Sequence, residues 1–348
     1  MRSAHHSFNP PTEVHMAPIR LALIGAGIFA RDAHLPAIQG LGDTYDVVAV
    51  HSRTRAKAEK LAALVGADVV DELDALLARD DIEAVDLVLP ISAMPDVIRK
   101  ALDAGKHIIS EKPAAPDITA GRDLLAEYAQ HADQIWMVAE NWRYESAFTR
   151  AAELVQAGEI GRPAMCHWVI YGDVGPDNKY YHTPWRRDSS FQGGFILDGG
   201  VHQIAAMRLV LGEIAEVSAV VTQVRDDLPP ADTLNAALRF ESGLTGMYSI
   251  TYAAPAPWPG MLHIAGDQGA LRVQPGEIEV TTAGGTSRTD RTDRAGVEGE
   301  FAAFAAAIRE GTSHRNAPEQ GMQDVAVIEA MLRSAETGQR VRVERFVG

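Results

Sequence analysis

The chain has 348 residues, of which 46% are hydrophobic and 23% charged, and its 32 basic and 47 acidic side chains give a formal net charge of −15. This composition excludes a disordered protein, and no apolar stretch reaches the ~18 residues that a membrane-spanning helix needs. The acid excess argues against nucleic acid or an anionic membrane as a partner, because a general basic field is lacking.

The length predicts two domains, preceded by a polar extension over residues 1–18 with Met16 as an alternative start. This extension lacks the apolar core of a signal peptide. The single cysteine, Cys166, can form neither an internal disulfide nor a thiolate metal cage. We therefore expect a protein of a reducing compartment, the cytoplasm.

The first part of the chain alternates short apolar strands with helical patterns, which is typical of a doubly wound parallel sheet. We assign residues 19–144 to a Rossmann dinucleotide-binding domain on this basis. The predicted strands are 21–24, 46–50, 84–89, 108–109 and 135–139, and the predicted helices are 54–65, 71–77, 96–102 and 117–130.

From residue 145 the rhythm changes, because strands follow strands and helices are few. We expect residues 145–348 to form an α+β domain with an open, mostly antiparallel sheet, and residues 282–299 to form an exposed loop. The predicted strands are 164–171, 215–224, 234–240, 244–252, 262–265 and 271–273, and the predicted helices are 147–156, 199–211, 298–310 and 319–336.

A G-x-G-x-x-A turn, Gly25 to Ala30, follows the first strand and precedes a helix. Gly25 allows a tight turn, Gly27 lets the backbone approach a pyrophosphate, and the helix start can hold the anion. We predict that Gly25, Gly27, Ile28 and Phe29 bind a dinucleotide, against the alternative of a plain tight turn.

The end of the second strand indicates which dinucleotide is bound. NAD is usually selected there by a carboxylate on the ribose hydroxyl, but this chain has no acid at that place. Ser52, Arg53 and Lys57 can instead bind a 2′-phosphate. The sequence thus favours NADP while leaving NAD open, and the alternative is a basic, solvated helix start.

Further motifs stand at Ser110-Glu111-Lys112-Pro113, Asn141–Tyr144, Gly193-Gly194 and Asp198-Gly199-Gly200-Val201-His202. With the glycine turn, they make residues 19–346 resemble the glucose-fructose oxidoreductase / inositol dehydrogenase (Gfo/Idh/MocA) family. The resemblance implies hydride transfer between a nicotinamide and a carbinol carbon of a sugar or polyol. It also implies a homodimer or homotetramer built on the open sheet of the second domain.

Three residues are candidates for the chemistry: Lys112, Asp198 and His202. Oxidation of a secondary alcohol needs a base for the hydroxyl proton and a positive charge or donor near the carbonyl oxygen. Lys112 lies at the carboxyl end of a parallel strand, and Asp198 and His202 are one helical turn apart. The alternatives are a surface lysine and a helix-face hydrogen bond, and the sequence leaves open whether Lys112 or His202 takes the proton.

The resemblance also places Glu111 and Lys112 by the cofactor, with backbone contact from Leu89 and Pro90. The family's usual Thr-Pro-Asn and following histidine are replaced here by Leu89-Pro90-Ile91 and Met94. We expect a substrate wall of aromatic and polar side chains, since such groups suit a sugar. Its candidates are Asn141, Arg143, Tyr144, Tyr171, Lys179, Tyr180, Tyr181, Trp185, Arg186 and Arg187, together with Asp198 and His202.

No metal site is predicted, because Asp198 and His202 lack a third ligand at a suitable spacing. The leading hypothesis is an NADP-preferring dehydrogenase or reductase for a sugar, sugar derivative or cyclic polyol. One alternative is a hydrolase or lyase that uses a bound nucleotide transiently and purifies with it. Another is a non-catalytic dinucleotide-binding sensor. The sequence does not name the substrate.

Overall fold

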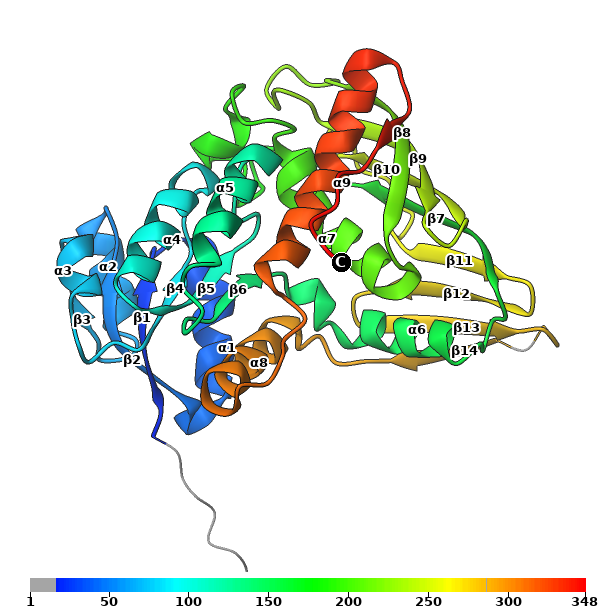
Figure 1. The fold of residues 1–348 in the computed structure, drawn as a ribbon. Helices are drawn as coiled ribbons and strands as arrows, with labels where there is room; N and C mark the ends of the chain where they lie inside the picture. The colour runs from blue at the N-terminus through cyan, green and yellow to red at the C-terminus, as the bar shows by residue number, and fades with distance from the viewer. Residues whose placement is uncertain (1–16, 286) are drawn as a thin grey trace, which may run out of the picture.

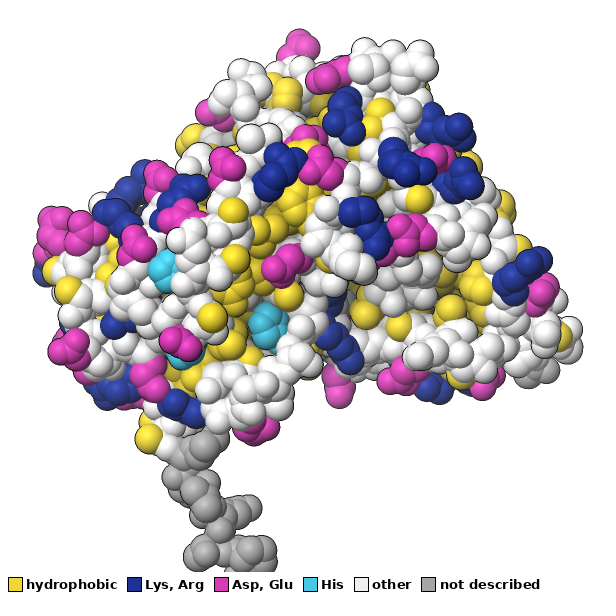
Figure 2. Space-filling view, in the orientation of Figure 1, with side chains coloured by type: hydrophobic (Ala, Val, Ile, Leu, Met, Phe, Trp, Pro, Cys, Tyr) yellow, Lys and Arg dark blue, Asp and Glu magenta, His cyan; other side chains and the backbone are white. Residues whose placement is uncertain are grey.

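The computed structural model describes residues 17–285 and 287–348, so the predicted extension lies outside the described residues up to Met16. Two sheets stand side by side, with the first part of the chain on the left of Figure 1 and the nine-stranded sheet on the right. No helix in the described ranges is long and apolar enough to cross a membrane. On the face shown in Figure 2, basic and acidic side chains are interspersed over both lobes.

The first sheet has six strands in the order β3-β2-β1-β4-β5-β6, and all neighbours are parallel. This confirms the doubly wound Rossmann prediction. The order reverses between β1 and β4, and ligands bind at the carboxyl edge beside such a switch point. The strands are β1 Ile19–Ile24, β2 Tyr45–His51, β3 Asp68–Val69, β4 Ala84–Leu87, β5 His107–Glu111 and β6 Trp136–Ala139.

The helices of this half agree with the prediction except near the glycine turn. There the helix contains a π-helical stretch, Ala30–His34, which turns His34 into the buried interior. Asp117 caps the start of α5 by accepting a hydrogen bond from the Ala120 amide at 2.8 Å. The α-helices are α1 Leu35–Gly40, α2 Arg55–Ala62, α3 Leu73–Leu77, α4 Met94–Asp103 and α5 Ile118–Tyr128.

The second sheet has nine strands in the order β14-β13-β12-β11-β7-β10-β9-β8-β15. Only the β7–β10 pair is parallel, so the mostly antiparallel prediction is confirmed. The strands are β7 Pro163–Tyr171, β8 Ile214–Thr222, β9 Thr233–Phe240, β10 Thr245–Thr251, β11 Leu262–Gly266, β12 Gly269–Gln274, β13 Glu277–Thr282, β14 Ser287–Arg291 and β15 Val341–Arg342.

The predicted loop over 282–299 is wrong, because β14 pairs with β13 and helix α8 begins at Gly296. The described side chains of β14 are mostly exposed and all polar. An edge strand that buries neither face lacks the alternating apolar pattern by which strands are predicted.

Four longer helices complete the second half: α6 Ser146–Gln156, α7 Phe195–Leu211, α8 Gly296–Glu310 and α9 Pro318–Thr337. Helices α6, α7 and α9 pack against the nine-stranded sheet. Helix α8 instead returns to the first half, where Phe301 and Phe304 join the core of β1 beside α1 (Figure 1). The hydrophobic core beside the first sheet therefore includes helix α8, which follows the second sheet in the sequence.

The other face of the nine-stranded sheet carries exposed apolar side chains. On β7, Cys166 and Trp168 are buried toward the helices, while Met165 and Tyr171 point away and are exposed. Met247 on the neighbouring β10 is 57% exposed. This face is open in the single chain.

Candidate active site

The glycine turn after β1 has the shape that a dinucleotide phosphate requires. Gly25 has φ +111°, and a Cβ there would lie 2.2 Å from the Val88 carbonyl oxygen, so only glycine fits. Gly27 is exposed, and a Cβ added to it would meet no atom within 4 Å. This open space lies at the start of the helix, where backbone amides can approach an anion. Ile28 and Phe29, which follow in the turn, are half-buried. The residues present therefore fit a dinucleotide.

The end of β2 lies beside this turn, because the Gly25 amide donates to the His51 carbonyl oxygen at 2.8 Å. Ser52 follows half-buried, and Arg53 and Lys57 are exposed without an ion pair in the described part of the chain. Nearby Arg55, by contrast, is bound by Glu59 at 2.9 Å and by Asp71. Residues 52–57 offer cations and hydroxyls, but no carboxylate, to a ligand.

Leu89 and Pro90 follow β4 and also border the turn. Both are half-buried, and Leu89 Cδ2 lies 3.4 Å from the position of a Cβ added at Gly25. Their place at the switch point is consistent with the predicted backbone contact to a cofactor.

Lys112, directly after β5, contacts the start of helix α7. Its Nζ donates to the Asp198 backbone oxygen at 2.8 Å and to Asp198 Oδ1 at 3.2 Å. Asp198 Oδ2 accepts from Arg186 Nε at 2.6 Å. Each of these three side chains is at most 15% exposed. Lys112, at the edge of the parallel sheet, is thus connected through Asp198 to Arg186. Both partners are predicted site residues that lie far from Lys112 in the sequence.

Asp198 stays ionised in this environment. Burial acts to raise its pKa, but the charges of Lys112 and Arg186 outweigh burial and lower the pKa to about 2. Packing explains the glycine that follows Asp198, because a Cβ added at Gly199 would lie 1.9 Å from the Tyr252 hydroxyl. Tyr252, which the sequence interpretation missed, therefore lies against the helix turn that carries Asp198.

His202 lies one turn after Asp198 on α7 and has a buried acidic partner. Its Nδ1 is 2.7 Å from Glu140 Oε1, and its ring is stacked on Trp142 at 5.3 Å. Glu140, missed in the sequence interpretation, directly follows β6 and is 1% exposed. Its place after a parallel strand, like that of Lys112, is the signal that could have identified it.

Glu111 takes part in a second buried cluster that the sequence did not reveal. Its Oε1 lies 2.9 Å from His34 Nε2, and His34 Nδ1 lies 2.9 Å from Asp86 Oδ2 on β4. Burial acts to lower the His34 pKa, but the two carboxylates outweigh it and hold the pKa well above its usual range. A protonated ring can donate from both nitrogens, to Glu111 and to Asp86.

Four predicted substrate residues, Asn141, Arg143, Tyr144 and Tyr171, are not brought to this cluster. Arg143 is 4% exposed, and its guanidinium is bound by buried Asp324, so it has a structural role. Tyr171 lies on the open sheet face against Trp258, with ring centroids 5.6 Å apart. Asn141 is half-buried, and its backbone packs against Gly296 of α8.

The segment between β7 and α7 supplies the other predicted wall residues. Trp185 and Tyr180 flank Arg186, whose guanidinium carbon lies 4.2 Å and 4.9 Å from their ring centroids. Lys179 Nζ reaches Asp32 Oδ2 at 3.3 Å, close to the glycine turn. This segment therefore spans from Asp198 to the cofactor edge. Tyr181 and Arg187 pair with each other at 4.3 Å, and Tyr144 instead bonds the Arg315 amide at 3.0 Å.

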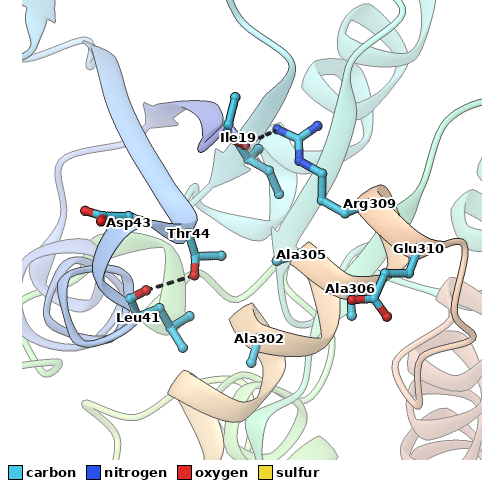
Figure 3. A pocket seen from close by; sticks show the side chains of 10 residues that line it. Ile19, Leu41, Asp43, Thr44, Ala302, Ala305, Ala306, Arg309 and Glu310 are labelled. Carbon is cyan, nitrogen blue, oxygen red and sulfur yellow. Dashed lines mark hydrogen bonds between the residues drawn. The ribbon is translucent and has the colours of Figure 1, made fainter. Parts of the chain in front are cut away.

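A surface pocket lies elsewhere, at the amino end of β1 between η2 (Gly42–Thr44) and α8 (Figure 3). Ile19, Leu41 and Arg309 are among its lining residues. Ligands of doubly wound sheets bind at the carboxyl edge, so this pocket is not the candidate site. Among the described residues, no cluster of three or more His, Cys, Asp or Glu side chains could hold a metal ion.

Comparisons with known proteins show the family to which the two halves of the chain are similar. Residues 19–139 match the family model described as "Oxidoreductase family, NAD-binding Rossmann fold", and residues 152–343 match "Oxidoreductase family, C-terminal alpha/beta domain". A dehydrogenase of Fusarium mangiferae is 34% identical over 94% of this chain and 99% of its own length. An NADP(+) D-xylose 1-dehydrogenase of Haloferax volcanii is 30% identical over 92% of this chain and 98% of its own. The crystal structure of an oxidoreductase from Thermotoga maritima, 36% identical, has a TM-score of 0.89 and covers 95% of this chain and 100% of that chain.

Proposed function

Because the chain belongs to the Gfo/Idh/MocA family of NAD(P)-dependent oxidoreductases, we propose that it is an NADP-preferring dehydrogenase or reductase for a CH–OH group of a sugar, sugar derivative or cyclic polyol. The observation that carries this proposal is the contact of Lys112 with Asp198, with His202 one turn further along α7. These groups meet at the carboxyl edge of the Rossmann sheet, where the nicotinamide is expected.

The preference for NADP rests on the end of β2. Arg53 and Lys57 have no ion pair among the described residues, and Ser52 offers a hydroxyl beside them. A 2′-phosphate would satisfy these groups, whereas the ribose of NAD would lack its usual carboxylate partner. The Haloferax volcanii relative, named for NADP(+), supports the same preference.

The nicotinamide, when bound, accepts or supplies the hydride, and the protein's own residues handle the proton. Lys112 donates to two oxygens of Asp198, an arrangement that suits a charged ammonium able to polarise the substrate oxygen. His202 Nε2 has no hydrogen-bond partner within the described ranges, so its lone pair is free to accept the hydroxyl proton. We assign Lys112 as the electrostatic donor, His202 as the base and Asp198 as the carboxylate that holds Lys112 and Arg186.

The substrate class rests on the side chains between β7 and α7. The Trp185 and Tyr180 rings flank the Arg186 guanidinium, which Asp198 holds through Nε. Flat apolar rings with nearby hydrogen-bonding groups suit the C–H faces and hydroxyls of a sugar ring. The named activity of the Haloferax volcanii relative, on D-xylose, is consistent with this class.

We further propose that the open face of the nine-stranded sheet forms a homodimer or homotetramer. Met165, Met247 and Tyr171 are 53%, 57% and 40% exposed on this face, and they lie on the neighbouring strands β7 and β10, where a second copy could cover them together. The single cysteine, Cys166, is buried and unpaired, which supports a reducing cytoplasmic location.

One screen tests the proposed function. Aldoses, cyclitols and keto-sugars are offered with NADP or NAD, and the absorbance of the reduced nicotinamide is followed. We expect turnover with at least one member of the panel and a higher kcat/KM with NADP. A protein that purifies with its nucleotide and never turns over added NADP would overturn the proposal in favour of a transient-oxidation mechanism.

A further inference from the structure

Glu140 is a buried carboxylate with an unusual set of partners. Its Oε1 accepts hydrogen bonds from His202 Nδ1 at 2.7 Å and from the Trp142 amide at 3.1 Å. Its Oε2 is buried and has no partner in the described part of the chain. Because a half-satisfied carboxylate destabilises a fold, stability alone does not account for its presence here.

The histidine ring is fixed in two further ways. Trp142 stacks on it with ring planes 18° apart, and Trp142 itself stacks on Phe148 and Trp168, both fully buried. Stacking sets the plane of the ring, and the bond to Glu140 sets its rotation within that plane. His202 Nε2 is then the nitrogen left without a partner, on a side chain that is 19% exposed.

The charge of Glu140 decides which nitrogen carries the proton. Burial acts to raise the pKa of Glu140, but the charges of Arg143, Lys112 and His202, when its ring is protonated, outweigh burial and lower the pKa. Glu140 Oε1 also accepts from the Trp142 amide, which places an acceptor opposite His202 Nδ1. A carboxylate can only accept, so the neutral ring must carry its hydrogen on Nδ1 and its lone pair on Nε2.

We propose that Glu140 is a positioning residue that fixes His202 in the tautomer with a free Nε2 and stabilises the imidazolium formed during turnover. In the oxidation direction the C–H bond breaks and the hydride would pass with its electron pair to the bound nicotinamide of the proposed function, while the O–H bond breaks, the C=O bond forms and the hydroxyl proton moves to His202 Nε2. The positive ring then faces the Glu140 carboxylate. This inference rests on the proposed function, in which His202 is the base.

The first test does not need the substrate. The protein is labelled with ¹⁵N-histidine, and the His202 signals are identified by their loss in His202→Ala. We expect an unprotonated Nε2 and a protonated Nδ1 in the wild type. Glu140→Leu is expected to abolish this preference, whereas Glu145→Gln, a change to another buried carboxylate in the same segment, should leave it unchanged. A wild-type ring protonated on Nε2, or an unchanged tautomer in Glu140→Leu, would overturn the proposal.

The second test uses turnover of the best substrate from the screen. Glu140→Gln should lower kcat/KM about 10²-fold and move the pH-rate profile to lower pH, and Glu140→Asp should recover part of the rate. In a His202→Ala background, Glu140→Gln should change kcat/KM by less than about twofold, because the imidazole that Glu140 positions is absent. An equal loss in both backgrounds, or an unmoved profile, would contradict a positioning role.

The two proposals fail separately. If His202→Ala retains full turnover, the assignment of the base in the proposed function fails while the tautomer measurement still reports on Glu140. If His202→Ala is inactive but Glu140→Gln behaves as the wild type, only the inference about Glu140 fails. Should Glu140→Gln not fold, the profile and tautomer of Glu140→Asp decide the question.

Discussion

Lys112 and Asp198 meet through two hydrogen bonds, from the lysine Nζ to the aspartate backbone oxygen at 2.8 Å and to Oδ1 at 3.2 Å. Lys112 directly follows strand β5 of the parallel sheet, and Asp198 lies in the first turn of α7. The pair therefore links the expected cofactor edge to the helix that carries His202.

Gly27→Val should abolish cofactor binding without affecting the fold. A Cβ at Gly27 meets no atom within 4 Å, so we expect the free energy of unfolding to stay within about 0.5 kcal/mol of the wild type. The new side chain fills the space for the diphosphate, and NADP affinity should fall at least about 100-fold. Fluorescence titration and urea unfolding measure the two quantities. Unchanged NADP affinity would contradict the assignment of this turn to the diphosphate. Gly25→Ala, which forces a Cβ against Val88, should by contrast markedly lower the free energy of unfolding.

Arg53→Ala should weaken NADP and spare NAD. Loss of the unpaired guanidinium removes a charged hydrogen bond to the 2′-phosphate, so we expect about a tenfold rise in the Kd for NADP. The Kd for NAD should remain within about twofold, because NAD has no group at that place. Isothermal titration with both nucleotides checks this, and Arg55→Ala is the matched control. Equal increases in the Kd for NADP and for NAD would contradict the assignment of Arg53 to the 2′-phosphate.

The ionisation of Asp198 predicts a specific loss of stability in acid. The carboxyl has an ordinary pKa of 3.8 and a pKa of about 2 when folded, so the folded state binds this proton more weakly. Its stabilisation is fully present above the unfolded value and is lost as the pH falls through about 2, with a total of roughly 2 kcal/mol. Urea unfolding of the wild type should show this additional loss below about pH 4, and Asp198→Asn should lack it. Parallel pH dependences for the two proteins would be inconsistent with the ion-paired aspartate.

Met247→Asp should dissociate the proposed oligomer. The side chain lies on the open sheet face and is 57% exposed in the single chain, so a charge there opposes burial against a second copy but not folding. Sedimentation velocity should give a dimer or tetramer for the wild type and a monomer for the variant. Leu64→Asp, at a 58% exposed site near α2, is the control and should keep the wild-type mass. A wild-type monomer would rule out the open-face interface.

The sequence predicted the parallel half of the fold well, because each of its buried strands is a short apolar run between helical patterns. It could not predict that α8 crosses back, since Phe301 and Phe304 have the same apolar pattern whichever sheet they pack on. It also missed β14, whose residues are polar on both faces of an edge strand.

Sequence motifs indicated which residues lie near the candidate site. They did not indicate where the side chains of other residues point. Lys112 and Asp198, both predicted as site residues, are in contact in the structure, but Arg143 points to Asp324, 181 residues away, which no local pattern reveals. For Tyr171, the period of two along β7 sets it on the face opposite Cys166 and Trp168. Finding His34 would have required knowing that its partners come from β4 and β5.

The role of Lys112 is tested by kcat/KM for NADP-linked oxidation of the best substrate by Lys112→Met. We expect a loss of about 10³-fold with the affinity for free NADP within about tenfold of the wild type, because the ammonium acts on the substrate oxygen. Lys100→Met, a change of a half-exposed lysine paired with Asp74, should retain wild-type turnover. If Lys112→Met turns over within twofold of the wild type, the Lys112–Asp198–His202 cluster is not the active site.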